Sequence, residues 1–112
     1  MSDEKTYRNV PFDGKTSSYT IWSKKFLSLC AIKGCDKVLT KDFPNMPSET
    51  ATLDPTNDAE LIELRKKNKL AYSMSLLSQN DVVSLDQITS GVTADLPSGS
   101  ARKAWQNLER IH

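Results

Sequence analysis

The side chains that could support catalysis or hold a metal ion are few in this sequence. Cys30 and Cys35 are separated by four residues, and the single histidine, His112, is the last residue. A structural zinc ion needs four Cys, His or carboxylate ligands, and a nucleophilic Ser or Cys needs an imidazole beside it. Carboxylate pairs such as Glu60 and Glu63 lie in polar segments, where exposure leaves both ionised and unsuited to general acid catalysis. We therefore expect no catalytic residues, no metal, no cofactor and no enzyme activity, and we interpret both cysteines as small apolar residues kept as thiols.

One basic cluster is the polar feature that could bind a ligand. Arg65, Lys66, Lys67 and Lys69 follow one another closely, and several cations on one helix could bind RNA phosphates. Consecutive residues point in different directions around a helix, so a solvated surface is the simplest interpretation. Contact with nucleic acid or with a partner subunit is the alternative. The net charge of +1 provides no long-range attraction to nucleic acid or to a membrane surface.

The sequence predicts one domain that begins with a long helix. Residues 1–15 are expected to form an extended N-terminal arm whose apolar end docks on a helical domain spanning residues 16–112. Ser17 or Ser18 can cap the first helix, and Gly34 can end it with a left-handed cap. Another turn is expected over residues 36–39, and a proline-rich loop over residues 40–57. The expected inner face of the first helix consists of Tyr19, Trp22, Phe26, Leu29 and Ile32.

Three more helices are predicted after the loop. The second long helix is expected to begin at Thr56 or Asn57, a short helix at Asp81, and the last helix at Ser98 or Ser100, while Gly91 ends the short helix. Their expected inner faces are Leu61, Leu64, Ala71, Met74 and Leu77, then Val82, Val83, Leu85 and Ile88, then Ala101, Trp105, Leu108 and Ile111. No segment has the alternating pattern of a strand, so we predict an all-α fold, a compact bundle of about four to five helices.

The order of the core residues resembles that of a known family. It runs through Phe12-Asp13-Gly14, then Tyr19 and Trp22, and ends in an Ala-x-x-x-Trp-x-x-Leu helix starting at Ala101. This order resembles the amino-terminal part of the Gag polyprotein of Ty/copia-type LTR retrotransposons. The residues that carry the resemblance, or share its core, are Phe12, Gly14, Tyr19, Trp22, Phe26, Gly34, Leu39, Ala101, Trp105 and Leu108.

The resemblance implies a capsid-like domain similar to the N-terminal domain of retroviral capsid proteins. Such a domain would self-associate through weak repeated contacts into a virus-like shell that packages the element's RNA in the cytoplasm, and a host genome could have reused it. It implies that the chain is a fragment of a longer polyprotein and that RNA contacts lie mainly in other regions. The apolar stretches are far shorter than the roughly 20 residues of a membrane helix, so we expect no membrane association. The alternatives are a helical RNA-binding module and a protein adaptor that docks a partner through residues 40–57.

Overall fold

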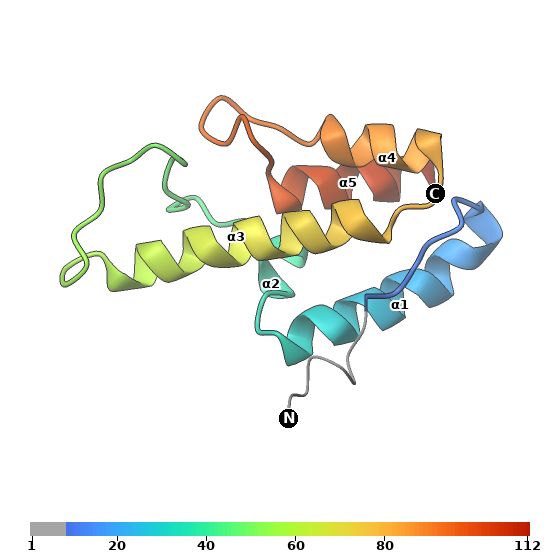
Figure 1. The fold of residues 1–112 in the computed structure, drawn as a ribbon, viewed down its shortest axis with the longest axis horizontal. Coiled ribbons are helices and arrows are strands. Elements are labelled where there is room, and N and C mark those ends of the chain that lie inside the picture. Colours follow the sequence, from blue (N-terminus) through green and yellow to red (C-terminus); the bar gives the residue numbers. More distant parts are fainter. Residues whose placement is uncertain (1–8) are drawn as a thin grey trace.

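A computed structural model of the protein describes residues 9–112, which form five helices. These are α1 (Thr16–Ile32), α2 (Lys37–Thr40), α3 (Ala59–Ser78), α4 (Val82–Thr89) and α5 (Ala101–Ile111). In Figure 1, α3 runs along the length of the molecule, with α1 on one side of it and α4 and α5 on the other. The prediction of an all-α bundle of four to five helices is therefore confirmed. None of the helices in residues 9–112 is long and apolar enough to cross a bilayer.

The segment before α1 is extended and packs onto the core. The Phe12 amide donates to the Ser78 carbonyl at 2.7 Å, and the Asn80 amide donates to the Phe12 carbonyl at 3.0 Å. These bonds place the Phe12 ring, which is 1% exposed, beneath the turn between α3 and α4. The remainder of the predicted arm, residues 1–8, lies outside the described residues.

Both ends of α1 are set by short-range hydrogen bonds. The helix begins at Thr16 rather than at Ser17 or Ser18, because the Asp13 carboxylate accepts from the Lys15 amide (2.9 Å) and the Ser18 hydroxyl (3.1 Å). The Ser18 hydroxyl, one of the two that could have capped the helix, therefore binds Asp13 instead. At the other end, Gly34 has a φ of +77° and its amide donates to the Ala31 carbonyl, so the predicted left-handed cap is confirmed.

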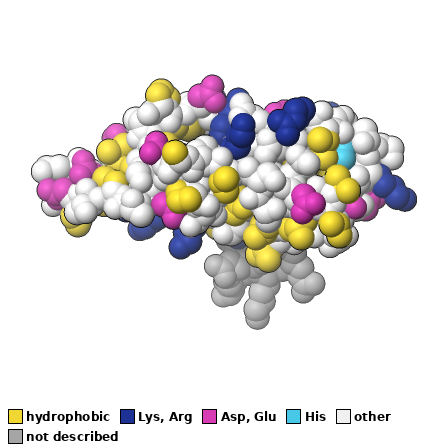
Figure 2. Space-filling model, turned by 90° about the horizontal axis from the view of Figure 1, so that it is seen from above, with side chains coloured by type: hydrophobic (Ala, Val, Ile, Leu, Met, Phe, Trp, Pro, Cys, Tyr) yellow, Lys and Arg dark blue, Asp and Glu magenta, His cyan; other side chains and the backbone are white. Residues whose placement is uncertain are grey.

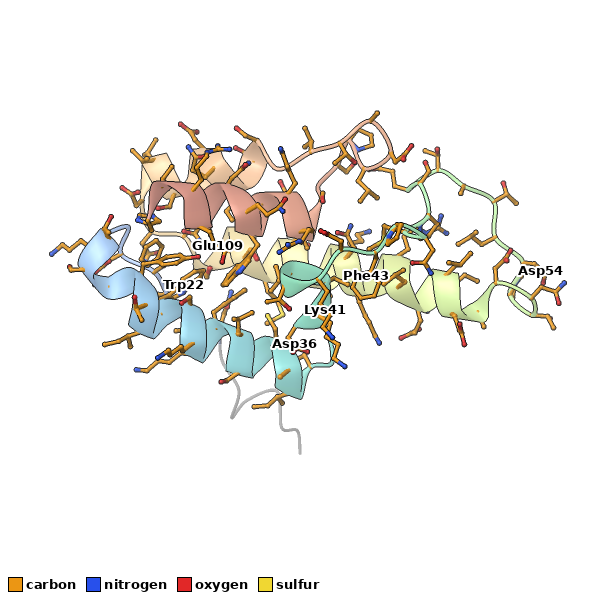
Figure 3. The ribbon with its side chains drawn as sticks, turned by 180° about the vertical axis from the view of Figure 1, so that it is seen from behind. Trp22, Asp36, Lys41, Phe43, Asp54 and Glu109 are labelled. Carbon is orange, nitrogen blue, oxygen red and sulfur yellow. The ribbon has the colours of Figure 1, made fainter. Side chains whose placement is uncertain are left out.

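Aromatic rings from α1 and α5 form the centre of the core. The Trp22 ring stacks on Phe26 with centroids 5.0 Å apart, and on Phe12 at 4.8 Å. Trp105 of α5 lies 5.6 Å from Trp22, and the Trp22 indole nitrogen donates to the Val10 carbonyl. Figure 3 shows Trp22 pointing from α1 into the space beneath α5. This packing joins the first and last helices of the chain.

Several residues predicted to be buried are exposed. Ile32 is 56% exposed because it lies about 100° around α1 from the centre of the buried stripe, where Cys30 takes its place. Leu77 is 77% exposed for the same reason, about 120° from the buried side of α3. On α4 only Ser84 and Ile88 are buried, so Val82, Val83 and Leu85, all exposed, were wrongly predicted to face inward.

The remaining helix ends agree with the sequence in part. Asp81 and Ser100 cap α4 and α5 as predicted, accepting from the Ser84 and Lys103 amides respectively. α3 instead begins at Ala59, because the Asp54 side chain binds the amides of the preceding turn at the far tip of the loop (Figure 3). Gly91 has no left-handed φ, and α4 ends at Thr89; a Cβ at Gly91 would lie 2.6 Å from the backbone of α5.

Candidate functional site

The structure divides the basic cluster of α3 between two sides of the helix. Arg65, Lys66 and Lys69 line a cavity of about 400 Å³, here called the cationic cavity. They lie within about 100° of one another around α3, whereas Lys67 lies about 160° from Lys69. Lys67 lines a separate groove between α2 and α3 together with Glu60 and Glu63. Three of the four cations therefore border one cavity, while Lys66, Lys67 and Lys69 are all exposed to solvent.

The proline-rich loop forms one wall of the cationic cavity. Arg65 Nη1 donates to the Ser48 carbonyl at 3.0 Å and to the Ala51 carbonyl at 2.8 Å, which holds the loop against α3. The Glu49 carboxylate in turn accepts from both the amide and the hydroxyl of Ser98, each at 2.7 Å. These two hydrogen bonds, with a smaller contribution from the Lys69 charge, hold the Glu49 pKa below its usual value. The loop, predicted to lack regular structure, has none over residues 41–58 and is tied at both α3 and the α4–α5 connection.

The floor of the cavity depends on a buried asparagine that sequence reasoning missed. Asn68 is 5% exposed; its Nδ2 donates to the Gly99 carbonyl at 3.1 Å, and its Oδ1 accepts from the Ala101 amide at 2.8 Å. Gly99 has a φ of 142°, and a Cβ there would lie 2.5 Å from the ring of Tyr72. A signal was available in the sequence, because Asn68 shares a helix face with the predicted core residue Leu64, but its basic neighbours suggested a surface position.

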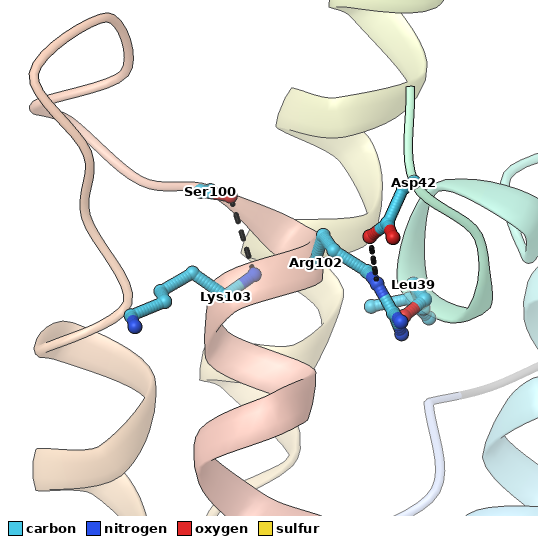
Figure 4. Close-up of polar contacts among 5 residues, drawn as sticks. All are labelled: Leu39, Asp42, Ser100, Arg102 and Lys103. Carbon is cyan, nitrogen blue, oxygen red and sulfur yellow. Dashed lines mark hydrogen bonds and ion pairs between the residues drawn. The ribbon is translucent and has the colours of Figure 1, made fainter. Parts of the chain in front are cut away.

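The lysines of the cavity have no acidic partner within the described chain. Among residues 9–112, the only ion pair joins Arg102 to Asp42 at 2.9 Å (Figure 4). Arg102 also donates to the Leu39 carbonyl, so it links the end of α2 to the start of α5. Lys66 and Lys69 are both exposed. Within the cavity lining the one carboxylate is Glu49, which already accepts two hydrogen bonds from Ser98.

A second surface feature is a run of exposed apolar side chains around the turn between α3 and α4. Leu77 is 77% exposed, Val82 73%, Val83 59% and Leu85 37%, and we call these four residues the α3–α4 apolar surface. Figure 2 shows exposed hydrophobic side chains on the face viewed, several of them close to the single histidine. Val83 and Leu85 lie about 160° apart around α4, with Val82 between them, so these side chains follow the outer side of the helix rather than forming one flat face. Exposed large apolar groups on a small domain are typical of interaction sites.

The cysteines and the histidine, which have potential catalytic or metal-binding chemistry, do not line the cationic cavity. Cys30 and Cys35 are free, buried thiols, and the interaction with the Cys35 thiol, together with burial, raises the Cys30 pKa. His112 stacks on Tyr19, and its Nδ1 lies 2.9 Å from the Thr16 hydroxyl, while burial lowers its pKa. Within residues 9–112 no three His, Cys, Asp or Glu side chains come together as a metal site would require.

The residues that carry the Gag resemblance take two structural roles. Seven of them are buried core residues, namely Phe12, Trp22, Phe26, Leu39, Ala101, Trp105 and Leu108. Gly14 and Gly34 both have positive φ angles, and Tyr19 packs on the aromatic core while half-buried. No family model, curated protein or solved structure matches the chain. The resemblance therefore rests on these residues alone.

Proposed function

We propose that this chain is a Gag-like capsid domain that self-associates in the cytoplasm to build a shell around retrotransposon RNA. The order of the core residues supports the family, and the α3–α4 apolar surface is the observation that carries the self-association. Its four large apolar side chains are exposed, whereas seven of the ten residues that carry the resemblance are buried. The partner in this proposal is a second copy of the same chain.

The charge and size of this surface fit weak contacts between identical copies. With a net charge of +1, two copies approach with little long-range repulsion. Burying one Leu or Val completely contributes about 1.5–3 kcal/mol, whereas bringing two proteins together costs about 4–15 kcal/mol. A contact made by four partly buried side chains is therefore weak alone, and a stable assembly would need many repeats of it.

Concentration-dependent NMR tests the proposal on the chain itself. As the protein concentration rises, the amide signals of residues 77–85 should shift, and electron microscopy of the most concentrated sample should show shells or tubes. The variant Val82→Ser/Val83→Ser should abolish both effects. The matched control is Ile21→Ser/Ile32→Ser, which removes two exposed apolar side chains from α1 and should change neither.

Two results would contradict the proposal. One is a sample that stays monomeric at the highest concentration, with no shifts in residues 77–85 and no particles. The other is self-association that the α1 control weakens as much as the α4 variant, because a specific surface must distinguish between them.

A further inference from the structure

We infer that the cationic cavity binds a phosphoryl group, supplied either by the backbone of single-stranded RNA or by a free nucleotide or polyphosphate. This inference deepens the RNA-binding part of the proposed function and needs no contact between copies of the chain. It assigns a site within these residues, whereas the resemblance places RNA contacts mainly in other regions.

Three cations from a single helix border the cavity. Lys66 and Lys69 are three residues apart, and Arg65 and Lys69 four, so their side chains rise from neighbouring positions on one face of α3. They open onto the same cavity of about 400 Å³, which lies within the size range of small-ligand sites. Glu49 of the proline-rich loop, together with Asn68 and Gly99, lines the same cavity, so the three cations border one recess rather than a flat surface.

The side chains that line the cavity carry more positive than negative charge. Glu49 is the only carboxylate that lines it, against three cations. Both Glu49 oxygens accept hydrogen bonds from Ser98, which keeps the carboxylate on the rim, tied to the α4–α5 connection. An excess of positive charge in a partly enclosed space attracts an anion more strongly than the same charges on an open surface would.

The three cations of the cavity make different contacts. Arg65 Nη1 donates to two carbonyls of the proline-rich loop, so Arg65 holds the loop against α3 while its charge lies at the cavity. Lys66 and Lys69 are exposed and make no ion pair within residues 9–112, so their ammonium groups are free to reach a ligand. We therefore assign phosphate contact to the two lysines and a positioning role to Arg65. The lysines are the residues to test, because changing them leaves the loop attachment intact.

Fluorescence anisotropy with a labelled single-stranded RNA, at a protein concentration where the chain is monomeric, provides the test. The variant Lys66→Gln/Lys69→Gln should weaken binding at least about tenfold and lower the slope of log affinity against log salt by about 1.4, since each contact to a single strand contributes about 0.7. The matched control, Lys37→Gln/Lys67→Gln, removes the same charge from the groove on the other side of α3 and should change affinity less than about twofold. Thermal unfolding of all three proteins checks that each is folded.

Titration with unlabelled tripolyphosphate and with ADP distinguishes the two phosphate sources. If the small anions bind at the lysine pair as tightly as RNA does, the site is one for free phosphates. If RNA binds much more tightly and still depends on Lys66 and Lys69, the site is one for an RNA strand. The inference is overturned if neither RNA nor the small anions bind, or if both double variants weaken binding equally, because the cavity would then contribute nothing beyond total charge. Neither result bears on whether the α3–α4 apolar surface self-associates.

Discussion

Replacing Asn68 with leucine should destabilise the protein strongly, although the two side chains have similar shapes. Asn68 Nδ2 donates to the Gly99 carbonyl, and Oδ1 accepts from the amide of Ala101, the first residue of α5. Leucine would keep the volume filled and exclude water, so both backbone groups would be left buried without a partner. A buried polar group that loses its partner costs about 1–3 kcal/mol, so Asn68→Leu should lower the free energy of unfolding by about 2–5 kcal/mol. This is a large share of the roughly 5–15 kcal/mol that holds a small domain together.

A second substitution separates the two hydrogen bonds. Asn68→Asp keeps the acceptor for the Ala101 amide, and a carboxylate is favoured at the start of a helix, but the donor to Gly99 is lost. Its free energy of unfolding should therefore fall as well, by about 1–3 kcal/mol for the lost hydrogen bond and further because a buried carboxylate oxygen would face the Gly99 carbonyl oxygen.

Urea unfolding followed by tryptophan fluorescence measures both variants, because Trp22 and Trp105 lie in the core. Lys67→Leu is the control at the neighbouring exposed position and should change the free energy of unfolding by less than about 0.5 kcal/mol. The NMR signal of the Ala101 amide should move in Asn68→Leu and stay close to its original position in Asn68→Asp. If Asn68→Leu is as stable as the control, the reasoning that this asparagine joins α3 to α5 is wrong.

Three further outcomes are expected. Gly14→Ala should lower the free energy of unfolding by about 1–3 kcal/mol in thermal or urea unfolding, because φ is +84° and the new Cβ would lie 2.5 Å from Asp81. The pKa of Glu49 is lower in the folded protein than its usual value of 4.5, so the ionised carboxylate stabilises the fold fully above pH 4.5 and loses this effect as the pH falls. Urea unfolding across this pH range should therefore show that the difference in free energy of unfolding between the native protein and Glu49→Gln becomes smaller at low pH. Cys30 and Cys35 are buried and should react with a thiol reagent such as DTNB only as fast as the protein unfolds, so rapid labelling of the native protein would contradict the placement.

Helix order and aromatic core could be predicted because they depend on local signals. The spacing of Trp22 and Phe26 on α1, the left-handed Gly34 and the Ser100 cap each act within a few residues, and each appears in the structure as the pattern indicates. Such signals state which residues can form a helix and where it can end. They state nothing about how much of the helix surface another element will cover.

The incorrect predictions of burial arise because local signals do not show which side of a helix another element covers. Val82 and Val83 are apolar and were expected to face the core, but α4 is covered on one narrow side only, where Ser84 and Ile88 contact the rest of the domain. Conversely, Asn68 looked like part of a basic surface, yet the connection before α5 passes directly over it. Both outcomes depend on contacts between segments far apart in the sequence, which residue type alone does not reveal.

The candidate site could be predicted only in its composition. The sequence identified the four cations, and helix geometry separates Lys67 from the other three. The loop beside Arg65 could not be predicted, because Arg65 bonds to carbonyls 14 and 17 residues earlier in the chain. Glu49 and Ser98, which form the rim, lie 49 residues apart. The cavity is therefore a product of tertiary structure, built around a cluster that local periodicity described as scattered.

The positions of the two proposed surfaces on α3 suggest how they would work together. Leu77 follows Lys66 by eleven residues, which places it about 20° away around α3 and about 16 Å further along the axis. A second copy bound at Leu77 would therefore lie near the cationic cavity, on the same side of α3. An RNA strand that reached two such cavities would gain the second contact at a high effective concentration. Weak contacts between copies and weak contacts to phosphate would then strengthen each other, so that RNA lowers the protein concentration at which a shell forms.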